Sequence, residues 1–109
     1  MDLYNSAVVD FNNCGHAFNE FINYRNQQFR PEKPDSAIQA MLDIPAGLSK
    51  TAAGKLDRIQ DADASTAALI DSFRKQLNDV NTRIEEQQVW LKKYFAKGRL
   101  FRKMMFSQH

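Results

Sequence analysis

The stretch STAALIDSFRKQLNDVNTRIEEQQVWLKKYFAK, residues 65–97, decides the fold predicted for this chain. Apolar side chains recur along it mostly at gaps of three, four or seven residues. This spacing places them on one face of an α-helix. They are Thr66 (by its methyl group), Ile70, Phe73, Leu77, Val80, Ile84, Leu91 and Phe95. The stretch therefore predicts one long amphipathic helix.

The ends of this helix are less sharply defined by the sequence. Asp61, Asp63 and Ser65 are competing N-caps, and acidic residues at this end suit the helix dipole. The helix is expected to run to about Lys97, roughly 50 Å at 1.5 Å per residue. It either ends at Gly98 or continues past a tolerated glycine.

Residues 2–29 carry a second apolar stripe with helical spacing. It consists of Tyr4, Val8, Phe11, Phe18, Ile22 and Phe29, with Gly15 and Arg25 at intervening positions and Ala7, Cys14 and Phe21 widening it. A stripe this wide predicts a core-facing helix rather than a two-stranded coiled coil. Arg25 on this face either pairs with an acid of the long helix, such as Glu85 or Glu86, or extends past the end of the core.

The middle of the chain predicts an interrupted arm. Pro31 and Pro34 end the first helix, because proline cannot continue it. Residues 35–61 then carry Ile38, Met41 and Leu42 on one face, before the sequence IPAG at residues 44–47. We expect a break near Pro45-Gly47, which leaves either one kinked helix or two short ones.

These patterns predict an all-α fold. A chain of 109 residues suits one domain, residues 1–109. The similar lengths of the first two arms favour an antiparallel three-arm bundle, up-down-up, with the middle arm broken near Pro45-Gly47 and the last helix overhanging. If the break separates two helices, the count is four. Charges interrupt every apolar run before the roughly 18 residues of a membrane-spanning helix.

Charge is distributed unevenly along the chain. The net charge is only +2, with fifteen basic and thirteen acidic residues. Residues 91–109 hold six of the basic residues and no acidic one, so the rest of the chain is net acidic. The overall value hides a polar chain with one basic end, the amphipathic segment 91–106.

The candidate binding residues of the chain lie in this basic segment and at Trp90 directly before it. They are Lys92, Lys93, Lys97, Arg99, Arg102 and Lys103, with Trp90 and Phe101 as apolar anchors. The composition is typical of a segment that binds an anionic membrane surface or an acidic partner. Cations here also offset the negative end of the helix dipole and solubilise an apolar stripe. Nucleic acid is disfavoured, because no folded nucleic-acid motif is present.

Trp90 and Tyr94 also have two interpretations. They are either an exposed recognition pair or, as the helical spacing favours, the edge of the packed face.

The sequence gives little support for catalysis or metal binding. His16 and Cys14 lie two residues apart, which on a helix points them to different sides, and His109 is terminal. His16 and Glu20 are four apart but lack a further metal ligand. Cys14, the single cysteine, has apolar neighbours and is interpreted as a core filler rather than a reactive thiol. We therefore expect no enzymatic activity, cofactor, metal or small-molecule substrate.

Residues 4–12, YNSAVVDFN, resemble the tyrosine-asparagine segment of helical envelope proteins of the LemA type. The resemblance covers nine residues and implies an association with the bacterial cell envelope, without carrying a fold or a site to this chain. As given, the chain begins without the basic and apolar regions of a signal peptide, which predicts the cytoplasm. A preceding export signal would predict the cell envelope instead.

Together these observations predict a non-enzymatic helical interaction or structural module. Its partner is expected to be another protein or a second copy of the chain. The alternative is a peripheral binder of an anionic membrane surface or acidic partner through residues 91–106.

Overall fold

The computed structural model describes residues 2–27, 36–60 and 62–107, and the side chains of the last helix as far as Ala96. These residues form three α-helices and no strand, so the all-α prediction is confirmed. The helices are α1 (Asp2–Gln27), α2 (Ser36–Asp57) and α3 (Ala64–Ser107).

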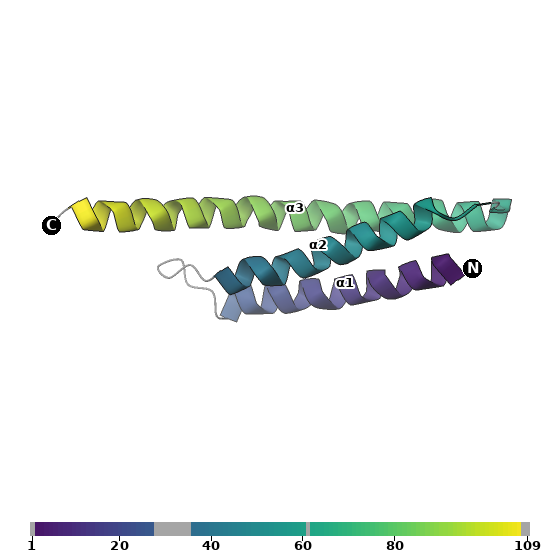
Figure 1. The fold of residues 1–109 in the computed structure, drawn as a ribbon, viewed down its shortest axis with the longest axis horizontal. Coiled ribbons are helices and arrows are strands. Elements are labelled where there is room, and N and C mark those ends of the chain that lie inside the picture. Colours follow the sequence, from purple (N-terminus) through teal and green to yellow (C-terminus); the bar gives the residue numbers. More distant parts are fainter. Residues whose placement is uncertain (1, 28–35, 61, 108–109) are drawn as a thin grey trace.

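The helices lie along one another in an elongated bundle (Figure 1). Helices α1 and α2 run in opposite directions and form the most extensive contact, whereas α3 packs mainly on α2 and approaches the α1 backbone at few points. The 44 residues of α3 give a length of about 66 Å at 1.5 Å per residue. This one helix accounts for the longest dimension of the molecule, 69 Å against 19 and 16 Å.

The buried face of α1 is centred differently from the predicted stripe. Its fully buried residues are Ala7, Cys14 and Phe21, which the sequence pattern places at the edge of the stripe. They lie seven residues apart and face the same side of the helix. The small side chains of Ala7 and Cys14 allow the backbone of α2 to approach closely, so this line of residues forms the α1–α2 seam.

Larger aromatic side chains of the predicted stripe span the wider gap to α3. Phe73 of α3 lies between two rings of α1, with ring centroids 5.8 Å from Tyr4 and 5.3 Å from Phe11. Both contacts are edge-to-face, at interplanar angles of 61° and 60°. This geometry is favoured by the quadrupoles of the rings.

The middle arm is one helix, so of the two alternatives for it the pair of short helices is wrong, and with it the option of a fourth helix. Helix α2 continues from Ser36 to Asp57 with Pro45 inside it. The reason is its buried face, which passes through the proline at alternating gaps of four and three residues: Ile38, Leu42, Pro45, Ser49, Ala52 and Leu56. Core packing on both sides of Pro45 offsets the cost of roughly 3 kcal/mol for proline in a helix interior.

Polar contacts reinforce the α1–α2 seam at two levels. The thiol of Cys14 donates to the carbonyl oxygen of Pro45 at 3.3 Å. Further along, the Lys55 ammonium lies 2.7 Å from a carboxylate oxygen of Asp10 and donates to the Ser6 hydroxyl at 2.6 Å. That oxygen of Asp10 is shielded from solvent, so Lys55 supplies it with a partner in place of water.

A polar pair lies between two apolar clusters along α2 and α3. One cluster contains Ala7, Ala52, Leu56, Ile70, Phe73 and Leu77, and the other contains Cys14, Phe21, Ile38, Leu42, Ile84 and Leu91. Ser49, fully buried, donates its hydroxyl hydrogen bond to Oδ1 of Asn81 between them. Such a pair is satisfied only when the two helices are in one register, so it specifies how α3 sits on α2.

Asp63, one of the three competing N-caps, caps α3; Asp61 lies outside the described residues. The Asp63 carboxylate accepts a hydrogen bond from the backbone N–H of Thr66 at 2.7 Å, and the Asp63 carbonyl accepts one from Ala67. The hydrogen bond from the Thr66 backbone lowers the pKa of Asp63. The contribution of this cap to the stability of the fold is therefore fully present above the ordinary aspartate pKa and is lost as the pH falls through the lowered value. At the other end, α3 continues through Gly98 to Ser107.

Replacing Pro45 tests whether α2 is one helix. Pro45→Ala restores a backbone N–H for the carbonyl of Met41 and removes a steric clash, a gain of roughly 3 kcal/mol. It also removes about two buried methylene groups, at a cost of about 0.8 kcal/mol each. We expect the free energy of unfolding, from urea titrations followed by circular dichroism, to rise by about 1–2 kcal/mol.

Gly47→Ala serves as the matched control in the same helix. Gly47 has open space where a Cβ would be placed, so alanine should stabilise a continuous helix by about 0.5–1 kcal/mol. A chain that needs a break at this position would instead be destabilised by both substitutions, which would contradict the continuous α2.

Candidate functional site

The predicted binding residues all lie on α3, at its C-terminal end. Lys92 and Lys93 are exposed, whereas Trp90 is half-buried. Lys97, Arg99, Phe101, Arg102 and Lys103 belong to the same continuous helix, and their side chains lie outside the described part of the structure. We name residues 91–106 the basic end of α3.

The basic end extends past the ends of both other helices (Figure 1). Helix α3 is 44 residues long, whereas α1 has 26 and α2 has 22. The excess of 18 residues over α1 corresponds to about 27 Å, and most of it lies at the C-terminal end. The last α3 residue that is fully buried among the described side chains is Leu91.

Arg25 of α1 holds α3 just before the basic end begins. Its Nη1 donates to Oε1 of Gln87 at 2.6 Å, and its guanidinium carbon lies 5.0 Å from the ring centroid of Trp90. The other nitrogens, Nε and Nη2, lie 3.3 Å from Oδ1 of Asn26. We name Arg25, Gln87 and Trp90 the α1–α3 clamp.

The clamp corrects the partner expected for Arg25. The arginine does reach α3, but it contacts a neutral amide and an aromatic ring rather than Glu85 or Glu86, which are exposed. A guanidinium is planar and weakly hydrated, so stacking on indole costs it less solvation than it would cost an ammonium. The position of Arg25 on the apolar stripe of α1 indicated that it could reach α3. Which residues of α3 it contacts depends on the rotation of α3 about its own axis.

The half-buried Trp90 and Tyr94 form the edge of the packed face. Their ring centroids are 4.2 Å apart, as expected for residues one helical turn apart. Trp90 also packs against the second apolar cluster together with Phe95. The indole therefore connects the core to the start of the basic end, and its fluorescence reports on both.

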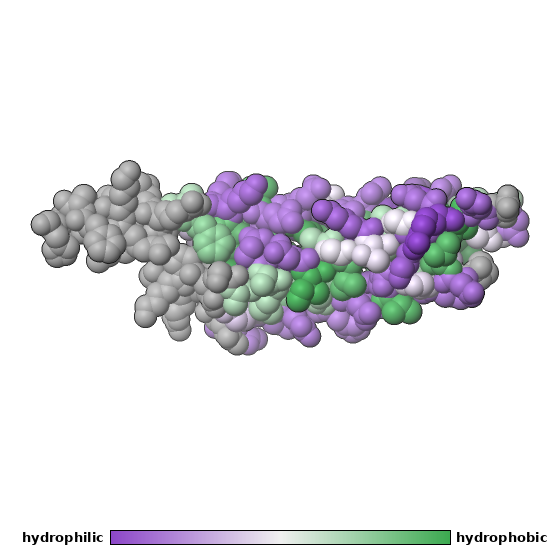
Figure 2. Space-filling view, in the orientation of Figure 1, coloured by the Kyte–Doolittle hydropathy of each residue, from purple (hydrophilic) through white to green (hydrophobic). Residues whose placement is uncertain are grey.

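Exposed charges change sign along this part of α3. Glu85 and Glu86 precede the clamp, and Lys92 and Lys93 follow it. Hydrophilic residues predominate along the upper edge of the molecule in the view of Figure 2, interrupted by apolar ones; Leu69 and Val89 of α3 are about half exposed. The clamp thus lies where an acidic and mixed surface gives way to a basic one.

The described residues offer little for catalysis or metal binding. No group of three histidine, cysteine, aspartate or glutamate side chains within ligand reach occurs among them. Cys14 is fully buried, and burial raises the pKa of its thiol, as expected for a core filler. No described helix combines the length and the apolar character needed to cross a membrane.

One feature between α2 and α3 could not be found from the sequence. A small cleft there is lined by Ala53, Arg74, Leu77, Asn78 and Asn81. The last four lie at helical spacing on α3, but their position opposite Ala53 depends on how the two helices pack.

Comparisons with protein-family models, with curated proteins and with solved structures give no match to this chain.

The clamp is tested by a double-mutant cycle with Arg25→Gln and Trp90→Leu, since leucine has no aromatic ring to contact the guanidinium. Loss of a cation–π contact at a partly exposed site is expected to cost about 0.5–1 kcal/mol, so the two substitutions should be coupled by that amount in urea unfolding. Arg25→Gln should also change the emission of Trp90 in the folded state. Arg83→Gln, at an exposed position of α3, is the control and should change neither. Strictly additive effects of Arg25 and Trp90 would contradict the clamp.

Proposed function

We propose that this chain is a non-enzymatic helical interaction module in which three helices, arranged up-down-up, present the basic end of α3 to an acidic partner. One observation carries the proposal: α3 is about 27 Å longer than the next helix, and the excess lies mainly where the cations are concentrated. Folding alone does not need this excess, because helices of a bundle bury their apolar faces only where they overlap.

The charge of the basic end sets the class of partner. Six cations and no acidic residue stand in residues 91–109. Two copies of such a segment would repel each other, so pairing of these ends with one another is disfavoured. An acidic protein surface is complementary to the segment and would be attracted over about one Debye length, roughly 10 Å at 0.1 M salt.

The α1–α3 clamp supports the proposal by fixing where the presented segment begins. The contacts of Arg25 with Gln87 and Trp90 hold α3 at the last turn before Lys92. A segment that starts from a fixed point on a rigid helix loses less conformational freedom when it binds.

An anionic membrane surface is the second candidate. The observation that favours it is the alternation of cations with Tyr94, Phe95, Leu100, Phe101 and the methionines of the basic end. Aromatic and aliphatic residues among lysines and arginines are typical of helices that lie at a lipid interface. The proposed location would then be a membrane surface.

Binding to two anionic probes tests the proposal. We expect the chain at low salt to bind poly-L-glutamate, a model for an acidic protein surface, with Trp90 fluorescence or co-sedimentation as the readout. The membrane candidate predicts binding to vesicles that contain phosphatidylserine and not to pure phosphatidylcholine. Neutralising Lys92, Lys93, Lys97 and Arg99 to glutamine should weaken membrane binding by roughly 1 kcal/mol per residue.

A matched control changes the same number of charges elsewhere. The exposed residues Lys50, Arg58, Lys75 and Arg83 are replaced by glutamine, which gives the same net charge and should leave most of the binding intact. Vesicle binding without polyglutamate binding would favour the membrane candidate. If neither probe binds at low salt, or if both variants lose binding equally, the basic end is not a binding segment and the proposal fails.

A further inference from the structure

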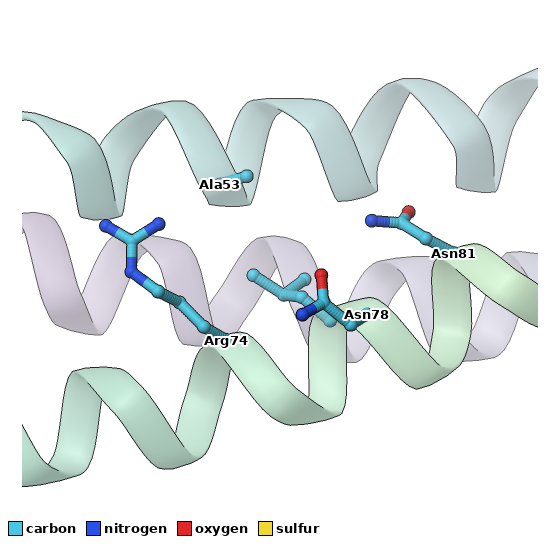
Figure 3. Close-up of a pocket in the computed structure, with 5 residues that line it drawn as sticks. Ala53, Arg74, Asn78 and Asn81 are labelled. Atoms are coloured by element: carbon cyan, nitrogen blue, oxygen red, sulfur yellow. The ribbon is translucent and has the colours of Figure 1, made fainter.

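The cleft between α2 and α3 is separate from the basic end and has no part in the proposed function. Ala53 of α2 faces Arg74, Asn78 and Asn81 of α3 across it, and the buried Leu77 contributes to its lining (Figure 3). Its volume is about 170 Å³. One water needs only about 10–15 Å³, whereas sites for drug-sized ligands begin at roughly 300 Å³. The size therefore suits a small ion rather than a nucleotide or an organic cofactor.

The amide of Asn81 is oriented by a residue outside the cleft. The fully buried hydroxyl of Ser49 donates to Oδ1 of Asn81. Because this bond occupies the oxygen, the two N–H donors of Nδ2 are at the other side of the amide. Figure 3 shows this nitrogen on the side toward Ala53. Asn81 thus offers the cleft hydrogen-bond donors that are already in place.

Arg74 adds the positive charge at the opposite end of the cleft. Its guanidinium extends from α3 toward α2, with Ala53 between it and Asn81 (Figure 3). Nη2 lies 2.8 Å from Oδ1 of Asp57, in an ion pair whose side chains are 41% and 65% exposed. An ion pair this exposed is weak, and a guanidinium has five N–H donors in a fork that matches oxyanions.

The lining favours an anion over a cation. Among the described residues that line the cleft, Arg74 carries the one charge, and none is a carboxylate. Asn78 is exposed, so its amide can rotate to present its N–H₂ group beside the other donors. Asp57, which lies outside the lining, acts as an internal competitor for Arg74.

We propose that this cleft binds a small oxyanion of the size of inorganic phosphate. Arg74 supplies a charge-assisted hydrogen bond, Asn81 supplies donors that Ser49 has oriented, and Asn78 completes the set. The same chemistry would recognise free phosphate or a single carboxylate group, and the choice between them is an outcome of the experiment below.

The experiment is an NMR titration of the ¹⁵N-labelled 109-residue chain with inorganic phosphate, and separately with acetate, at constant ionic strength maintained with chloride. We expect saturable shifts, within the millimolar range, of the side-chain signals of Arg74 Nε–H and of the amides of Asn78 and Asn81. Saturation by phosphate alone assigns the cleft to phosphate, and saturation by acetate extends the proposal to carboxylates.

Three variants test both the sign and the size of the expected change in the association constant. Arg74→Gln should lower the association constant about tenfold or more, because a hydrogen bond to a charged group is lost. Asp57→Asn should raise it roughly two- to fivefold, because an exposed competing ion pair and a repelling charge are removed. Arg83→Gln, exposed and outside the cleft, should leave it unchanged.

All three replaced residues are at least partly exposed, so each variant is expected to fold, which the backbone amide spectrum checks. The proposal is overturned if phosphate gives no saturable shift at these side chains. It is also overturned if Arg74→Gln leaves the association constant unchanged, or if Asp57→Asn weakens binding.

Discussion

The close contact between α1 and α2 is the constraint on which the rest of the structure depends. Ala7 and Cys14 are small enough for the two backbones to approach, and the Cys14 thiol donates directly to the carbonyl of Pro45. Pro45 and Ser49 fill the two positions at which the buried face of α2 would otherwise be interrupted. Because α2 is held as one helix, it offers α3 a continuous surface, and Ser49 sets the register through Asn81.

The elements with strong apolar spacing could be predicted from the sequence, and those that depend on contact geometry could not. The buried positions of α3, from Ile70 to Leu91, follow from their spacing alone. The continuity of α2 was not predictable, because a sequence pattern does not identify proline and serine as core residues. Their burial is evident only once the packing of the helices is known. Likewise, the sequence pattern placed Ala7 and Cys14 at the edge of the apolar stripe of α1, because small residues contribute little to such a pattern. In the structure they lie at the centre of the buried face.

The candidate site also combines features that are evident in the sequence with features that depend on how the helices pack. The cations of the basic end are evident in the sequence, and so is the overhang of the last helix past the other two. Whether that helix ends at Gly98 or continues past it was left open by the sequence, and the structure continues it to Ser107. Arg25 was recognisable as an odd residue on an apolar stripe, but its partners Gln87 and Trp90 are set by the rotation of α3. The cleft at Arg74 and Asn81 arises only when α2 and α3 meet.

In the proposed function, the bundle is a rigid support and only the basic end of α3 engages an anionic partner. Amide hydrogen–deuterium exchange, measured on the full chain with and without poly-L-glutamate, tests it most directly. We expect slower exchange confined to residues 91–107, with α1 and α2 unchanged, since binding orders only the segment that it covers. Protection spread over α1 and α2, with residues 91–107 unchanged, would contradict it.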